Sequence, residues 1–318
     1  MLKKMILKKI LVTMLTLIIF LLIYLMPSNE SNKVMEVKQN LEYTYDTYIE
    51  TIYLLDNTDY VARTHIKGIN SSSKTNIATD LLEGLIVEGK KSNIIPNGFK
   101  AIIPSGTKVL DVKLEDKALT VNFSRELLEI NAKYEEKMLE AIIYTLTSID
   151  GIDKVKILVE GSPLDKMPNS KNNLPTLLDK SYGINKVYEL TNTKDIDSYT
   201  VFYVNSFNNN YYYVPVTKYI NNNNQDKIKV IISELTSKPT YESNLMSFLN
   251  VNTKLLNYEI KDNTIRLNFN NLILSDIVNN SILEEVIYTI SLSLNSELNV
   301  NEVIFMVENE EICKKVLE

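Results

Sequence analysis

Apolar and polar positions divide the chain into a hydrophobic N-terminal run and a longer region of alternating patterns. From Ile10 to Met26 the chain is apolar apart from two threonines, and Pro27 closes the run. Counted from Met5, the run reaches the ~20 residues that a helix needs to cross a bilayer. Because lysines precede it and acidic residues follow it, we expect residues 1–27 to form a cytoplasmic stub and a single-pass membrane helix, with the rest of the chain extracytoplasmic.

A cleaved signal peptide is the alternative interpretation of this run. Its last residues, Tyr24 to Pro27, offer no small-x-small cleavage site, which favours a retained anchor. No cysteine stands near its end, so lipid attachment there is excluded. Residues 28–46 are polar with scattered Val and Tyr, and we expect them to form a tether.

The rest of the chain contains one pattern twice. Residues 107–124 (TKVLDVKLEDKALTVNFS) align without gaps with residues 253–270 (TKLLNYEIKDNTIRLNFN). In each copy, two stretches of alternating polarity flank a turn at an Asp residue, which is typical of a β-hairpin. The identical positions are Thr107/Thr253, Lys108/Lys254, Leu110/Leu256, Asp116/Asp262, Asn122/Asn268 and Phe123/Phe269.

An amphipathic helix and an apolar strand follow each hairpin. Apolar residues with i, i+3, i+4, i+7 spacing form one stripe in each copy, and an Ile-Tyr-Thr triplet lies in both helices. The stripes match Leu139, Ile142, Ile143 and Leu146 with Leu283, Val286, Ile287 and Ile290. The strands that follow are expected at residues 155–160 and 303–308.

Each copy also begins with a hairpin and a helix. The expected strand pairs are 51–55 with 60–64 and 200–204 with 213–217, and the helices carry Ala78, Leu81, Leu82 and Leu85 or Ile228, Ile231, Ile232 and Leu235. The predicted fold class is therefore α/β (α+β), with two tandem strand-strand-helix-strand-strand-helix-strand modules. We expect the helices to cover one face of a mixed sheet.

These patterns place the first module at residues 47–163 and the second at 198–310. Residues 164–197 contain two prolines and several Asn and Lys residues, and are interpreted as a linker with a short helix near residues 176–180. Residues 311–318 are interpreted as a tail.

Net charge and the counts of histidine and cysteine limit the partners and the kinds of site that the chain can have. The net charge is -6 and no dense basic stripe follows the N-terminus, so nucleic acid is not an expected partner. His65 is the only histidine and Cys313 the only cysteine, which excludes an intrachain disulfide and the usual zinc sites. We interpret His65 as a solvated strand-end residue and Cys313 as a tolerated tail residue, and expect no metal, no cofactor and no catalytic residue.

Acidic residues occur on the second helix of each module, where a carboxylate pair is the remaining catalytic arrangement. The apolar stripe faces the core, so we interpret these carboxylates as a solvated helix face and expect that the chain is not an enzyme. They are Glu135, Glu136 and Glu140 in the first module and Glu284 and Glu285 in the second.

Three consecutive tyrosines, Tyr211, Tyr212 and Tyr213, follow a polar turn in the second module. In a strand at least one of these rings must face outward. Tyrosine suits protein interfaces and stacking on sugar rings, so the three are candidate interface residues. Ordinary packing within a hairpin is the alternative.

The first module resembles a known family. Residues 103–124 (IPSGTKVLDVKLEDKALTVNFS), the helix ending in Gly89, and residues 141–161 (AIIYTLTSIDGIDKVKILVEG) are similar to the GerMN domain of bacterial sporulation and germination proteins. The second copy keeps the pattern, although Asn252 replaces Gly106 and the Pro-Ser-Gly turn is lost. The resemblance implies a ring-building-motif-like fold. Family members with this tandem arrangement are typically lipoproteins, so the anchor differs here.

The resemblance also implies a role in spore formation and germination. The expected role is a non-enzymatic assembly or docking component of an envelope ring or channel, in the space between mother cell and forespore. Its partners are then ring proteins or further copies of the chain. The alternative is an extracytoplasmic ligand-binding module for peptidoglycan or a small-molecule germinant, and a hydrolase is a third interpretation.

Overall fold

The structure is a computed structural model that describes Met14, Leu17 and residues 49–317, except 68, 70, 72, 222–224, 238–242 and 299. Residues 46–318, called the 46–318 fragment below, form a compact unit separate from residues 1–45. Apart from Met14 and Leu17, the predicted anchor and tether lie outside the described residues. In the described part of the chain, no helix is long and apolar enough to span a bilayer.

The strand and helix order predicted for each module is confirmed, with three strands added: β3 between α2 and β4, β7 after β6, and β14 after β13. The first module contains β1 (Ile49–Asp56), β2 (Val61–Lys67), α2 (Lys74–Leu85), β3 (Phe99–Lys100), β4 (Val109–Glu115), β5 (Ala118–Phe123), α3 (Glu135–Leu146), β6 (Lys154–Val159) and β7 (Ser162–Pro163). The second contains β9 (Ile196–Phe207), β10 (Asn210–Asn221), α4 (Lys227–Thr236), β11 (Leu255–Lys261), β12 (Thr264–Phe269), α5 (Glu284–Leu298), β13 (Glu302–Val307) and β14 (Glu310–Val316). The helix expected to end in Gly89 thus ends at Leu85.

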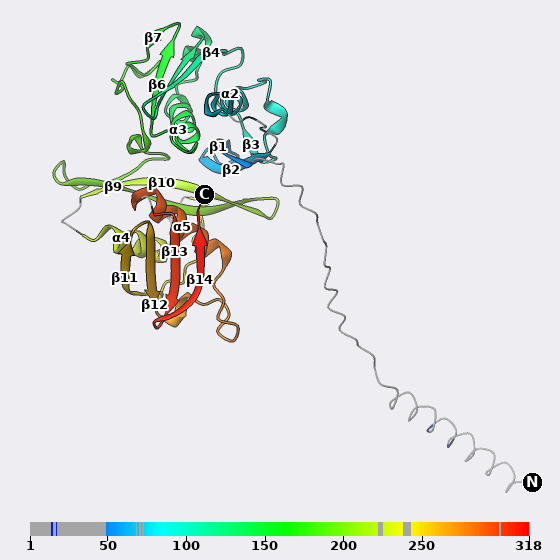
Figure 1. Cartoon of the computed structure of the whole chain (residues 1–318), viewed down its shortest axis with the longest axis vertical. Helices are drawn as coiled ribbons and strands as arrows, with labels where there is room; N and C mark the ends of the chain where they lie inside the picture. Colours follow the sequence, from blue (N-terminus) through cyan, green and yellow to red (C-terminus); the bar gives the residue numbers. More distant parts are fainter. Residues whose placement is uncertain are drawn as a thin grey trace, which may run out of the picture. The chain divides into compact units, whose positions relative to one another are not determined.

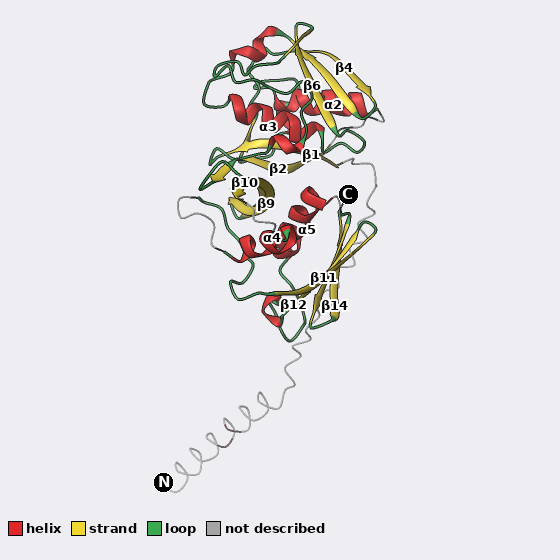
Figure 2. Cartoon of the chain, turned by 90° about the vertical axis from the view of Figure 1, so that its left-hand side faces the viewer, coloured by secondary structure: helices red, strands yellow, loops and turns green. Residues whose placement is uncertain are grey.

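Each module is built of three layers, which corrects the prediction of helices on one face of a single mixed sheet. Sheets β4-β5-β6-β7 and β11-β12-β13-β14 are separate from the hairpins β1-β2 and β9-β10. The helices α2 and α3, or α4 and α5, lie between the hairpin and the four-stranded sheet of their module (Figures 1 and 2). Polarity alternation shows that one face of a strand is buried, but not which strands share a sheet.

The aligned hairpins fold alike in both modules. Asn122 Oδ1 accepts a hydrogen bond of 2.9 Å from Gly161 N, and Asn268 Oδ1 accepts one of 2.9 Å from Asn309 N, so each Asn fixes the turn after β6 or β13. Phe123 and Phe269 are fully buried. Asp116 and Asp262 lie at positive φ in the hairpin turns, where Asp is tolerated. These identities between the copies therefore mark residues that build turns and core.

The second helices of the modules correspond one turn later than the sequence alignment predicts. Thr145 Oγ1 on α3 accepts a hydrogen bond of 2.9 Å from Tyr53 N on β1. Ser293 Oγ on α5 does the same for Phe202 N on β9, also at 2.9 Å. Thr145 thus matches Ser293, four residues beyond its predicted counterpart, and Leu283, assigned to the apolar stripe, precedes α5 and is exposed. A four-residue shift almost preserves a stripe with a 3.6-residue period, so the pattern does not reveal it.

Removing either helix hydroxyl is expected to destabilise the fragment. Thr145→Val or Ser293→Ala leaves a strand N–H without its acceptor, and the free energy of unfolding should fall by about 1–2 kcal/mol for each. Urea unfolding of the 46–318 fragment, followed by circular dichroism, measures this. Thr176→Val, at an exposed position, is the control, and equal midpoints for it and Thr145→Val would contradict the expected role.

The predicted tail is a strand rather than a tail. Up to Val316 it forms β14, which pairs with β13 and places Cys313 opposite Phe305. Burial raises the pKa of the Cys313 thiol. The side chain therefore stays protonated at neutral pH and packs as a small apolar group.

Candidate functional site

The segment predicted to be a linker joins the two modules through packed contacts. Met167, Leu178 and Ile184 are buried in it. It contains a 3-10 helix at Lys180–Tyr182, where the sequence predicted a helix near residues 176–180, and a short strand β8 (Val187–Glu189) that pairs with β10 in parallel. This segment is therefore part of the folded body.

Asn185 holds the two modules together at one point of the junction. Its Oδ1 accepts a hydrogen bond of 2.9 Å from Val61 N on β2, and its Nδ2 donates to Val61 O and to Pro215 O on β10, both at 2.8 Å. Asn185 is buried and has φ +46°, a left-handed conformation that Asn adopts more readily than most residues. One side chain thus bridges strands of both modules where the β2–β10 ladder is a single pair, Arg63 with Tyr213.

Asp56 forms a second connection. The carboxylate is fully buried at the end of β1. Its Oδ1 accepts hydrogen bonds from Thr58 N (2.8 Å) and Tyr60 N (2.9 Å) in its own module. Its Oδ2 accepts from Asn205 Nδ2 (3.0 Å) and Tyr212 OH (2.9 Å) in the second module. The turn of the first hairpin is therefore tied to the second hairpin.

The two hairpins form one sheet across the junction. Its strand order is β3-β1-β2-β10-β8, with β9 pairing with β10. The helices of the first module lie on one side of this sheet and those of the second on the other (Figure 1). The modules are consequently held in one orientation by a ladder and by two buried polar side chains.

The three candidate tyrosines divide between the junction and the surface. Tyr211 is 51% exposed and packs edge to face on Phe248 with ring centroids 5.4 Å apart. Tyr212 is buried against Asp56, and Tyr213 stacks on Tyr288 at 5.3 Å. Two of the rings thus serve packing within the chain, and Tyr211 faces outward; an interface role for the three residues stays a prediction.

The interpretation of the acidic residues on α3 as a solvated face is wrong for two of them. Glu135 and Glu140 are only 5% and 2% exposed. Glu135 accepts hydrogen bonds from Asn169 N (2.6 Å) and Ser170 N (3.0 Å). Both residues lie in the segment 164–197 that joins the modules, called the joining segment below. Glu140 Oε2 accepts one of 3.0 Å from Asn185 N. Backbone N–H groups distant in sequence cover this helix face, whereas Glu136 and Glu284 are partly or fully exposed.

Burial dominates the electrostatics of Glu140. It raises the pKa of Glu140 to about 7, against the opposing effects of the Asn185 N–H and the Lys186 ammonium. Lys186 Nζ lies 4.0 Å from Glu140 Oε1 and 2.7 Å from Glu136 Oε1. The joining segment is therefore docked on a carboxyl group that changes charge near neutral pH.

We expect Glu140→Gln to change how stability depends on pH. In the unfolded chain this carboxyl titrates near 4.5, so between about pH 4.5 and 7 the unfolded state has lost a proton that the folded state keeps. Raising the pH through this window therefore costs the wild type stability. The stability of the variant relative to wild type should rise across it by about 2–3 kcal/mol. Urea unfolding at several pH values measures the difference, and a difference independent of pH would contradict it.

The only histidine lies within β2 rather than beyond it. His65 is exposed, as predicted, and its Nε2 accepts a hydrogen bond of 2.9 Å from Arg63 Nη1. Partial desolvation of the ring and the neighbouring guanidinium lower the pKa of His65 to about 4. The ring is consequently neutral at pH 7. Among the described residues, no three His, Cys, Asp or Glu side chains are grouped as metal ligands.

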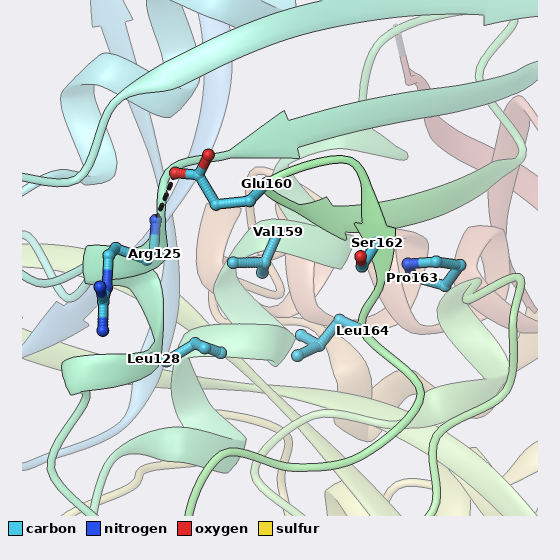
Figure 3. Close-up of a pocket in the computed structure, with 7 residues that line it drawn as sticks. All are labelled: Arg125, Leu128, Val159, Glu160, Ser162, Pro163 and Leu164. Carbon is cyan, nitrogen blue, oxygen red and sulfur yellow. Dashed lines mark hydrogen bonds between the residues drawn. The ribbon is translucent and has the colours of Figure 1, made fainter.

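A shallow depression of about 400 Å³ lies beside the β6-β7 turn (Figure 3). Leu128, Val159 and Leu164 form its apolar walls, and Glu160 lies on its rim with Oε1 accepting a hydrogen bond of 3.1 Å from Arg125 N. The aliphatic walls suit contact with an apolar side chain, and the Glu160 carboxylate is held by a backbone N–H. They do not form an acid–base pair.

Fold and junction define a class: a tandem α+β protein in which two copies of one module share a sheet and present surfaces in a fixed arrangement. Comparison with known proteins gives the family. The Germane family, described as "Sporulation and spore germination", matches residues 51–165 and 200–313, and the chain belongs to it, with tandem GerMN domains.

A relative in sequence and a solved structure agree with this assignment. The chain is 34% identical over 265 residues to the spore germination protein GerM of Bacillus subtilis strain 168, covering 81% of this chain and 70% of that protein. The solved structure of the tandem GerMN domains of the sporulation protein GerM from Bacillus subtilis superposes with a TM-score of 0.76 at 31% identity. That match covers 83% of this chain and 92% of the solved one. The chain is thus a homologue of GerM, from a family not described as enzymatic.

Proposed function

We propose that the chain is a non-enzymatic, membrane-anchored component that docks or joins proteins of an envelope ring or channel between mother cell and forespore. The N-terminus lies in the cytoplasm and the two modules in the intermembrane space. The observation that carries the proposal is the junction: Asn185 and Asp56 hold two copies of one module as a single body. Such a body presents the equivalent surfaces of its two modules at a fixed spacing.

A fixed spacing matters for assembly because a rigid pair of like surfaces engages two neighbouring subunits without the entropy cost of ordering a flexible linker. The ring-building-motif-like packing that the family resemblance implies fits this geometry. An anchor followed by the tether 28–46 would keep the body near the membrane while it binds.

Binding of glycan strands is a second candidate, and the exposed ring of Tyr211 favours it. Tyrosine rings stack on the apolar faces of sugars. Co-sedimentation of the 46–318 fragment with purified peptidoglycan, compared with its Tyr211→Ser variant, separates this candidate from docking on proteins.

Cross-linking in sporulating cells tests the docking proposal. A tagged full chain, replacing the native copy, is expected in a high-mass complex in the membrane fraction. An Asn185→Ala chain that accumulates to the same level should lose that complex and lower the yield of germinating spores. A chain that stays monomeric in cells that sporulate and germinate normally would overturn the proposal.

A further inference from the structure

One apolar identity between the two modules has no role in turn or core. Leu110 and Leu256 occupy equivalent positions in the aligned hairpins, and their side chains are 47% and 52% exposed. Lys108 and Lys254 are also exposed, and the other identical side chains lie in turns or cores, as described for Asn122 and Phe123. Within the strands of these hairpins, the other exposed positions differ between the copies, as Lys113 and Glu259 do.

Both leucines lie at the same local irregularity. The β4-β5 ladder shifts register between Val109 and Asp111, and the β11-β12 ladder shifts between Leu255 and Asn257. Each leucine is therefore the extra residue of a β-bulge. Bulges re-aim a side chain at the edge of a sheet.

The strands that carry these bulges end their sheets. The orders are β4-β5-β6-β7 and β11-β12-β13-β14, so β4 and β11 are terminal. The opposite edges are protected against pairing: β7 is two residues long and contains Pro163, and β14 carries Glu310, Glu311, Lys314 and Lys315. Beyond the bulge, β4 and β11 each continue for five residues, Asp111–Glu115 and Asn257–Lys261.

The exposed charges on these two strands complement each other. On β4, Asp111 and Lys113 are exposed and alternate with residues that pack on the core. On β11, Glu259 and Lys261 are exposed. An antiparallel pairing that sets Lys113 opposite Glu259 also sets Asp111 opposite Lys261, so opposite charges meet at both positions. The 2.8 Å Lys113–Asp111 contact is exposed and therefore weak enough to exchange.

We propose that β4 of one copy pairs edge to edge with β11 of a second copy, with Leu110 packed at one end of the ladder beside the Asp262 turn and Leu256 at the other end beside the Asp116 turn. The proposal rests on the proposed assembly function and assigns its self-association surface. Because the contact joins different surfaces of the two copies, each copy keeps one free edge and the series continues as an open chain or closes as a ring. The occupant of both edges is this chain itself.

Sedimentation of the 46–318 fragment, a compact unit with its own cores, tests this surface. The apparent molecular mass of the sedimenting species should rise with protein concentration over the micromolar to millimolar range. The double variant Leu110→Ser, Leu256→Ser should associate about tenfold or more weakly. Leu177→Ser, at a leucine 43% exposed in the joining segment, is the matched control and should associate as wild type does. Equal association of all three proteins would overturn the proposal.

A charge exchange gives a second test that does not depend on removing apolar groups. Lys113→Glu or Glu259→Lys alone should abolish association, and the two changes in one chain should restore it, because the pair is re-formed with reversed sign. A double variant no better than either single one would overturn the assigned pairing.

Disulfide trapping extends the test to the full chain in membranes. In a Cys313→Ser background, which contains no other cysteine, Lys113→Cys with Glu259→Cys should form covalent dimers and higher species on mild oxidation, whereas Leu177→Cys with Glu259→Cys should not. If these covalent species do not form but the envelope complex still forms in cells, this inference fails and the proposed function stands. If neither the covalent species nor the envelope complex forms, the inference and the proposed function both fail.

Discussion

Replacing Asp56 by alanine is expected to lower the free energy of unfolding of the 46–318 fragment by about 3–4 kcal/mol. The carboxylate is fully buried and accepts hydrogen bonds from two backbone N–H groups of its own turn and from Asn205 and Tyr212 of the other module. Alanine removes the acceptor that these donors share, and Asn205 and Tyr212 lie at buried positions, where an unsatisfied donor costs free energy. Urea unfolding followed by circular dichroism measures the loss.

Two milder variants divide this effect between the module and the junction. Tyr212→Phe keeps the ring and removes only the hydroxyl that donates to Asp56, and should cost about 1–2 kcal/mol. Asp56→Asn keeps one acceptor but points an NH₂ group at existing donors, so it should fall between Tyr212→Phe and Asp56→Ala. Asp56→Ala with the stability of wild type would show that these bonds do not hold the modules together.

The main strands and helices and the internal repeat could be predicted from the sequence, because polarity alternation and helical spacing are local properties of the chain. The hairpins around Asp116 and Asp262 and the strand pairs that begin each module are found where the pattern predicts them. The division of the strands between two sheets was not predictable in the same way. A strand with one apolar face gives no sign of whether its partner is the preceding strand or one on the far side of a helix.

The junction escaped prediction for a different reason. Glu135 and Glu140 were assigned to solvent because a carboxylate on a helix is normally hydrated, and only backbone N–H groups from residues 169–185 reverse that expectation. Asn185 itself stands in a polar stretch that looks like a linker. The available signal was the apolar Ile184 beside Gly183, which is unusual in an exposed loop and indicates a buried point within the segment.

The two modules depend on this segment for their orientation, since the direct ladder between β2 and β10 is one residue pair. A tandem protein joined by a flexible linker would let each module bind alone, at an effective concentration set by the linker. In this chain the linker is itself a structural element of the shared sheet. Function and stability should therefore respond together to changes at the junction.

Asn185→Ala is expected to lower the free energy of unfolding by about 3–4 kcal/mol and to separate the unfolding of the two modules. The substitution removes three hydrogen bonds, to Val61 N, Val61 O and Pro215 O, which would leave these backbone groups buried without partners. It also places alanine at φ +46°, where its Cβ is strained. Calorimetry of the 46–318 fragment should show one transition for wild type and two for the variant.

Asn185→Gly distinguishes the lost bonds from the backbone strain. Glycine adopts positive φ without penalty, so it should recover about 1 kcal/mol relative to alanine and still lose the three bonds. Asn172→Ala, in the same segment but exposed, should leave a single transition at the wild-type temperature. If Asn185→Gly were as stable and as cooperative as wild type, the side-chain bridge would contribute nothing. The orientation of the modules would then depend on the β2–β10 pair, on Asp56 and on apolar contacts such as that of Phe99 with Tyr212.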